Sequence, residues 1–154
     1  GTWSVAARFD VPKTIREGLT DAVAGKADVL YAKGSNLVSD YDLEMRSTMF
    51  GRELGRDNRT DAQLLNEALA VARRSDVIVA ALGEASEMSG ESSCRTDIGI
   101  PDVQQKLLKA LVATGKPVVL VLFNGVANVE WLFVVYVLKM FRHVKCYPIH
   151  YFAR

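Results

Sequence analysis

The residues best suited to chemistry lie in one polar segment, residues 83–101, which directly follows an apolar run at residues 77–82. In open α/β folds the loops that leave buried strands carry the chemistry, because the strand ends are fixed while the loops can vary. A carboxylate held near other charges can have its pKa tuned for proton transfer. The segment therefore predicts a carboxylate-based site, and its charged candidates are Glu84, Glu87, Glu91, Arg95 and Asp97.

Other chemistries lack their usual residues in this sequence. The chain contains no Gly-x-Gly-x-x-Gly or Walker-type sequence for phosphate binding and no Gly-x-Ser-x-Gly for a serine nucleophile. His143, Cys146 and His150 have the short spacing of metal ligands, but no fourth ligand accompanies them. We therefore predict that the protein holds no metal and no cofactor.

The elements around the polar segment are predicted from apolar periodicity. Helical spacing and capping residues predict helices at residues 12–25, 60–74 and 101–114, and short apolar runs predict strands at residues 27–32, 77–82 and 118–123. Residues 37–58 show no sustained period and receive no assignment. Apolar strands between amphipathic helices predict an α/β fold, a three-layer sandwich with a mostly parallel sheet covered by helices on both faces.

Composition limits the classes of partner. The chain has 154 residues, 24% of them charged, which suits one globular domain. Its net charge of +1 does not provide the positive field that attracts nucleic acids. Residues 129–141 are apolar, but Lys139 interrupts them and a bilayer span needs about 20 apolar residues. We expect no membrane span. The chain starts at Gly1 without a signal peptide, so we expect it to begin within a longer protein. Cys94 and Cys146 leave the compartment open.

Six stretches carry a family resemblance. They are GTWS (1–4), VLYAKG (29–34), SDVIVA (75–80), GEA (83–85), ESSCRTDIGIP (91–101) and ATGKPVVLVLFNG (113–125). Taken in this order they are specific. Residues 1–125 are similar to the C-terminal α/β-sandwich domain of glycoside hydrolase family 3, in particular that of the periplasmic β-glucosidases. The resemblance implies a periplasmic location for the parent protein.

The resemblance ends at Gly125, where the family usually continues Asn-Gly-Arg-Pro and this chain has Asn124-Gly125-Val126-Ala127. We therefore divide the chain into a family-like α/β domain, residues 1–125, and an aromatic and basic tail, residues 126–154. Its composition favours an altered reading frame over a fusion or a replaced set of strands. The domain is then expected to be truncated at its C-terminal side.

The resemblance also implies a reaction, the retaining hydrolysis of β-glucosides by two carboxylates. The nucleophile is expected on a preceding barrel domain that is not in this chain, and the acid/base glutamate on this domain's polar segment. Glu91, in GESS (90–93), is the position that matches the family's acid/base. The alternatives are that Glu91 is a solvated residue without a catalytic role, or that Glu84 or Glu87 takes the role instead.

The remaining candidates have supporting roles. Glu84 is expected to order the polar segment through backbone donors, and Arg95 and Asp97 to pair and brace it. Trp3 either stacks on a sugar of the substrate or packs within the domain. Asp40, in VSDY (38–41), copies the family's nucleophile pattern but follows a turn of this domain, so we reject it as a nucleophile.

Two hypotheses about function follow. In the first, the chain supplies the acid/base side of a β-glucosidase, is inactive alone, and acts on a β-glucoside or oligosaccharide when docked on the barrel domain. In the second, it is a truncated and catalytically inactive α/β module whose tail mediates self-association into a homo-oligomer.

Overall fold

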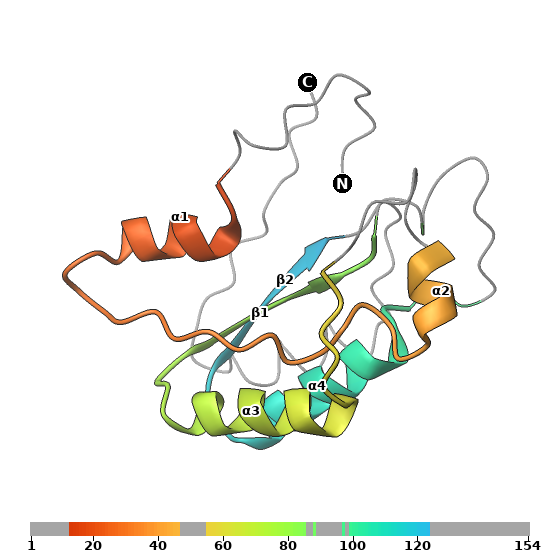
Figure 1. Ribbon diagram of the computed structural model, residues 1–154. Coiled ribbons are helices and arrows are strands. Elements are labelled where there is room, and N and C mark those ends of the chain that lie inside the picture. Colours follow the sequence, from red (N-terminus) through yellow and green to blue (C-terminus); the bar gives the residue numbers. More distant parts are fainter. Residues whose placement is uncertain (1–12, 47–54, 86–87, 89–96, 98, 124–154) are drawn as a thin grey trace.

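The protein is described from a computed structural model, which describes residues 13–46, 55–85, 88, 97 and 99–123. These residues form four α-helices and two strands, which are labelled in Figure 1. In chain order they are α1 (Ile15–Ala22), α2 (Tyr41–Arg46), α3 (Asp61–Arg73), β1 (Ile78–Gly83), α4 (Asp102–Ala113) and β2 (Val118–Phe123).

The two strands form a parallel pair. Their register runs from Ile78 opposite Val118 to Gly83 opposite Phe123. Parallel neighbours need a crossover connection, and α4 provides it between the two strands. The predicted α/β class with a parallel sheet is confirmed, and the carboxyl ends of both strands meet at one edge.

One face of the sheet packs on α3 and α4, which lie together below it in Figure 1. β1 alternates along its length, so that Ile78, Ala80 and Leu82 are buried in the core while Val79 is exposed. The helices contribute Ala68, Ala72, Leu107, Leu108 and Leu111 to the same cluster. This packing fixes β1 relative to the start of α4.

The helix ends follow the sequence signals. The predicted Thr60-x-x-Gln63 capping box is confirmed, because the Thr60 hydroxyl accepts from the Gln63 N–H and the Gln63 side chain accepts from the Thr60 N–H. Gly115, with φ of 75°, ends α4 as predicted. Thr14 and Glu17 form a second capping box at α1, which buries no residue.

Two expectations from the sequence were wrong or incomplete. Residues 27–32 form no strand, because a strand requires a paired neighbour and only β1 and β2 pair among the described residues. Their exposed Leu30 and Tyr31 side chains show that β-propensity did not lead to burial there. The unassigned residues 37–58 contain the short helix α2.

Candidate functional site

The polar segment leaves the sheet at Gly83, the last residue of β1. Gly83 has φ of 151°, and a Cβ at this position would lie 2.0 Å from the backbone oxygen of Phe123. Only glycine accepts both that backbone conformation and that approach. The next residue, Glu84, donates its N–H to the Phe123 carbonyl at 2.8 Å. The chain therefore leaves β1 in a direction fixed by β2.

Gln104, in the first turn of α4, holds the same strand end from the other side. Its Oε1 accepts from the Gly83 N–H at 2.8 Å, and its Nε2 donates to the carbonyls of Gly83 at 2.8 Å and Leu37 at 3.0 Å. The residue is only 4% exposed. A buried side chain thus bonds both backbone groups of Gly83, as a neighbouring strand would.

Sequence reasoning missed Gln104, although a signal was present. Leu107, Leu108 and Leu111 follow it at three, four and seven residues, so that Gln104 occupies an apolar-stripe position of the helix. A polar residue inside such a stripe must be hydrogen-bonded when it is buried. Which backbone it bonds could not be read from the chain.

The polar segment returns to α4 through a second set of contacts. The Asp97 Oδ1 accepts from the Gly99 N–H at 2.8 Å, and the Gln105 Nε2 donates to the Ile100 carbonyl at 2.8 Å. Gly99 and Ile100 are buried, and Pro101 is the N-cap residue of α4. The two described ends of the segment therefore both lie at the start of α4.

The predicted site residues are only partly within the described residues. Glu91, Trp3, Arg95 and the rival Glu87 lie outside them, as does the tail 126–154. The catalytic role of Glu91, the stacking of Trp3 and the brace between Arg95 and Asp97 stay predictions. Asp97 itself is exposed and accepts from Gly99.

Glu84 is the described carboxylate nearest along the chain to the end of β1. Its side chain is half-buried, and its Oε2 is withdrawn from solvent. Its backbone N–H, bonded to Phe123, continues the parallel pairing by one residue. This position fits the predicted ordering role, which itself stays a prediction.

Asp40, rejected as a nucleophile from the sequence, lies at the start of α2. Its Oδ1 accepts from the Leu43 N–H at 2.9 Å, and its backbone carbonyl accepts from the Glu44 N–H at 3.0 Å. These are the contacts of a helix-capping aspartate. The VSDY sequence thus has a local structural use in this domain.

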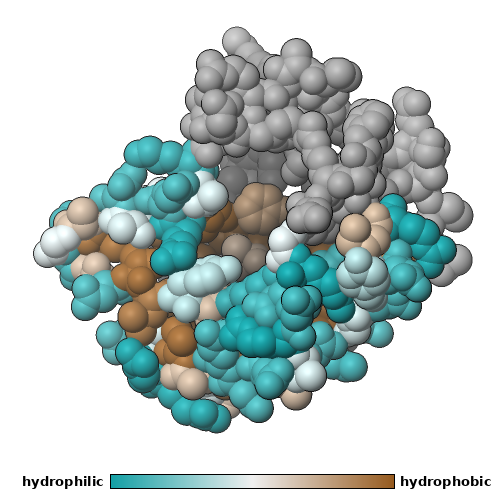
Figure 2. Space-filling view, in the orientation of Figure 1, coloured by the Kyte–Doolittle hydropathy of each residue, from teal (hydrophilic) through white to brown (hydrophobic). Residues whose placement is uncertain are grey.

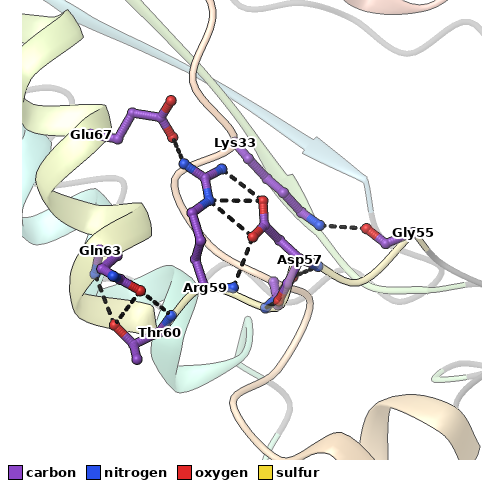
Figure 3. A network of polar contacts seen from close by, with 8 residues as sticks. Lys33, Gly55, Asp57, Arg59, Thr60, Gln63 and Glu67 are labelled. Carbon is purple, nitrogen blue, oxygen red and sulfur yellow. Dashed lines mark hydrogen bonds and ion pairs between the residues drawn. The ribbon is translucent and has the colours of Figure 1, made fainter.

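A polar network joins residues 33–39 to residues 55–61, and Figure 3 shows its part around Asp57 and Arg59. Asn36, 2% exposed, exchanges two hydrogen bonds with the backbone of Asp57, and the Lys33 Nζ donates to the Gly55 carbonyl at 2.6 Å. The Arg59 guanidinium bonds both Asp57 and Glu67. These contacts tie the two segments to each other and to α3.

The charges of this network shift one another's pKa values. Hydrogen bonds from the Arg59 side chain and backbone hold the pKa of Asp57 well below its ordinary range, and Asp57 in turn raises the pKa of the Arg59 guanidinium. Burial lowers the pKa of the Lys33 ammonium. Asp57 and Arg59 therefore keep their opposite charges at neutral pH.

A further ion pair lies beside the network. Glu44 in α2 is buried and pairs with the Arg56 guanidinium, which also donates to the carbonyls of Val38 and Ser39 at 3.0 and 2.8 Å. Arg56 thus joins α2 to the segment before it. Sequence reasoning left this region unassigned and found neither residue.

No group of three or more His, Cys, Asp or Glu residues that could hold a metal ion occurs within the described ranges. Of the helices that the structure describes, none is long and apolar enough to cross a membrane. The described site consists of backbone amides, two glutamines and carboxylates.

The sequence profile of the glycosyl hydrolase family 3 C-terminal domain matches residues 1–137 of this chain. The chain belongs to this family. The match includes the whole polar segment and both strands, and it continues past Gly125, where the resemblance noted from the sequence ended.

Several proteins are similar to this family 3 domain. A periplasmic β-glucosidase of Salmonella typhimurium is 40% identical over 125 residues, which are 81% of this chain and 16% of that protein. A β-xylosidase of Formosa agariphila is 30% identical over 112 residues, 73% of this chain and 13% of that protein. The thermostable β-glucosidase B of Acetivibrio thermocellus is 30% identical over 111 residues, 72% of this chain and 12% of that protein.

A solved structure shares the fold. It is a β-glucosidase involved in saponin metabolism from intestinal bacteria, with a TM-score of 0.53 and 32% identity over 72% of this chain and 16% of that chain. This chain spans only 12–16% of the length of the three curated relatives named above.

Proposed function

We propose that this chain is the acid/base part of a retaining β-glucosidase, with Glu91 as the proton donor and the nucleophile on a barrel domain elsewhere in the parent protein. The observation that carries the proposal is the segment 84–101, which leaves the carboxyl end of β1 and returns at the start of α4. Loops at this edge of an α/β sheet are where ligands bind. Family membership and the names of the relatives supply the substrate class.

The chemistry divides between the two domains. A retaining enzyme needs its two carboxyl groups about 5–5.5 Å apart, so this domain must dock on the barrel before either group can act. The protonated Glu91 would donate to the glycosidic oxygen while the nucleophile attacks the anomeric carbon and the bond to the leaving group breaks. The Glu91 carboxylate would then take a proton from the water that hydrolyses the glycosyl–enzyme. This chain alone is expected to be inactive.

Complementation with a separately produced barrel domain tests the proposal. We expect the mixture to hydrolyse an aryl β-glucoside and Glu91→Gln to abolish this activity, with Glu84→Gln and Glu87→Gln as matched controls on the same segment. An aryl leaving group needs little protonation in the glycosylation step, but turnover should still be lost, because the second step needs the Glu91 carboxylate to take a proton from the attacking water. Activity that survives Glu91→Gln, or that Glu87→Gln removes instead, would assign the acid/base role elsewhere.

The same assay bears on substrate choice. One relative is named a β-xylosidase and others β-glucosidases, so an aryl β-xyloside should be run beside the β-glucoside. We expect the glucoside to be preferred, because the relative with 40% identity is a β-glucosidase. A preference for the xyloside would revise the substrate and leave the acid/base role intact.

A second candidate function is that of an inactive α/β module that self-associates. It is favoured by the exposed apolar side chains of Val79, Val119 and Phe123 on the two strands and of Val77 directly before β1. Figure 2 shows apolar surface among hydrophilic residues on one face of the molecule. Light scattering tests this candidate, since a monomer at micromolar concentration would exclude it. A concentration-dependent dimer without complementation would favour it.

A further inference from the structure

We propose that Gln104 and Gln105 are positioning residues, which fix the two ends of the segment 84–101 from adjacent places at the start of α4. They would thereby determine where this segment can present a carboxylate. The effect on the carboxylate rests on the proposed function. The fixing of the two ends concerns this domain alone and is tested separately.

Gln104 fixes the end at which the segment begins. Its side-chain amide makes three hydrogen bonds of 2.8–3.0 Å, two to Gly83 and one to Leu37, inside a site that is almost closed to water. Loss of the amide would remove the hydrogen-bond partner of the buried Gly83 N–H and carbonyl and of the part-buried Leu37 carbonyl. Gly83 would then keep only its contacts with β2 to fix its direction.

Gln105 fixes the end at which the segment returns. Its Nε2 donates to the Ile100 carbonyl and lies 3.2 Å from where a Gly99 Cβ would be. The Asp97 Oδ1 would lie 3.1 Å from the same Cβ. A Cβ at Gly99 would therefore lie tightly between a side chain of the segment and a side chain of α4, and these neighbours would have to move by a few tenths of an ångström.

The two glutamines act from one rigid base. Consecutive residues point about 100° apart around a helix, so adjacent side chains can reach two different ends of a segment. Val103, Leu107, Leu108 and Leu111 hold α4 in the core. The spacing between the two ends is consequently set by a packed helix, whatever contacts the segment makes in between.

Amide hydrogen exchange of the whole chain tests whether Gln104 and Gln105 fix the two ends of the segment. We expect Gln104→Glu to speed exchange at Gly83 and Glu84 at least tenfold at neutral pH, because a carboxylate would face the Gly83 and Leu37 carbonyls. At acid pH the protonated side chain can donate again, so protection corrected for the intrinsic rate should return. Gln105→Ala should speed exchange at Gly99 and Ile100 and leave Gly83 protected.

Gln63→Ala is the matched control, because it removes a glutamine from the capping box of α3 and so lowers stability away from the segment. If it changes exchange at Gly83 as much as Gln104→Glu does, the proposal is wrong. It is equally wrong if Gln105→Ala opens both ends alike, since the two glutamines would then have no separate roles.

Kinetics of the complemented enzyme test whether the two glutamines determine where the segment presents its carboxylate. A misplacement of about 1 Å can cost on the order of 100-fold in rate, so Gln105→Ala should lower kcat at least tenfold and leave KM within about twofold. Gln63→Ala should change neither. A rise in KM with kcat unchanged would overturn the positioning role. Failure of Glu91→Gln to reduce activity, with the exchange results intact, would instead overturn the proposed function.

Discussion

The replacement Gly83→Ala gives the sharpest test of how the strand end is built. The added methyl would meet the Phe123 backbone oxygen at 2.0 Å, and the Phe123 carbonyl carbon and nitrogen at 2.7 and 2.8 Å. All three atoms are backbone of the paired strand, so no side-chain rotation can relieve the contact. Either β1 must turn away from β2 or the chain must leave the sheet one residue earlier.

The cost follows from two effects. An alanine at φ of 151° is strained by about 1–3 kcal/mol, since essentially only glycine occupies that region. Displacement of the strand end also removes the hydrogen bond from the Glu84 N–H to Phe123, which contributes about 0.5–1.5 kcal/mol. The free energy of unfolding should therefore fall by about 1.5–4.5 kcal/mol.

Urea denaturation of the chain measures this change, and Gly115→Ala supplies the control. Gly115 also has a positive φ, 75°, but a Cβ there would meet no atom within 4 Å. Gly115→Ala should therefore cost only the backbone strain, about 1 kcal/mol. If the two variants lose the same stability, the close approach of Phe123 to Gly83 does not exist in solution, and the fixed exit direction fails with it.

Three further perturbations are predicted. Thr60→Ala should lower the stability of the chain by about 1 kcal/mol in urea denaturation, and Thr60→Ser should restore most of it, because the serine hydroxyl can still cap α3. Because Arg59 lowers the pKa of folded Asp57 below its ordinary 3.8, the stability that Asp57 contributes is fully present above pH 3.8 and is lost as the pH falls through the lower folded value. Asp57→Asn should therefore flatten the acid limb of a stability-against-pH curve, and an unchanged limb would contradict the assignment. Arg56→Ala should cost about 3 kcal/mol in urea because it leaves buried Glu44 unpaired, and a loss no larger than that of Arg59→Ala would show that the Glu44 pair is not buried.

The helices and paired strands show where local sequence signals suffice. Thr60 and Gln63 predicted the start of α3, and Gly115 predicted the end of α4, because capping depends on residues within one turn. The apolar runs before Gly83 and after Pro117 predicted β1 and β2. Both runs are apolar at every position and do not alternate between apolar and polar residues. This pattern pointed to a parallel pair, as observed.

The errors lie where structure depends on distant partners. Residues 27–32 had the composition of a strand, but a strand needs a neighbour, and composition does not supply one. Residues 37–58 had no periodicity to read, since α2 has only six residues. It is stabilised by Asp40 at its start and by the pairing of Glu44 with Arg56, twelve residues further along the chain.

By itself the sequence determined the α/β class, the family, and a carboxylate-bearing segment between an apolar strand and an amphipathic helix. These follow from periodicity, capping and motif residues, which act over a few positions. Only the tertiary structure decided that Gln104 reaches back to Gly83 and Leu37, and that Gly83 must be a glycine. Such contacts join residues 21 and 67 positions apart, and only the packing of α4 against β1 brings them together.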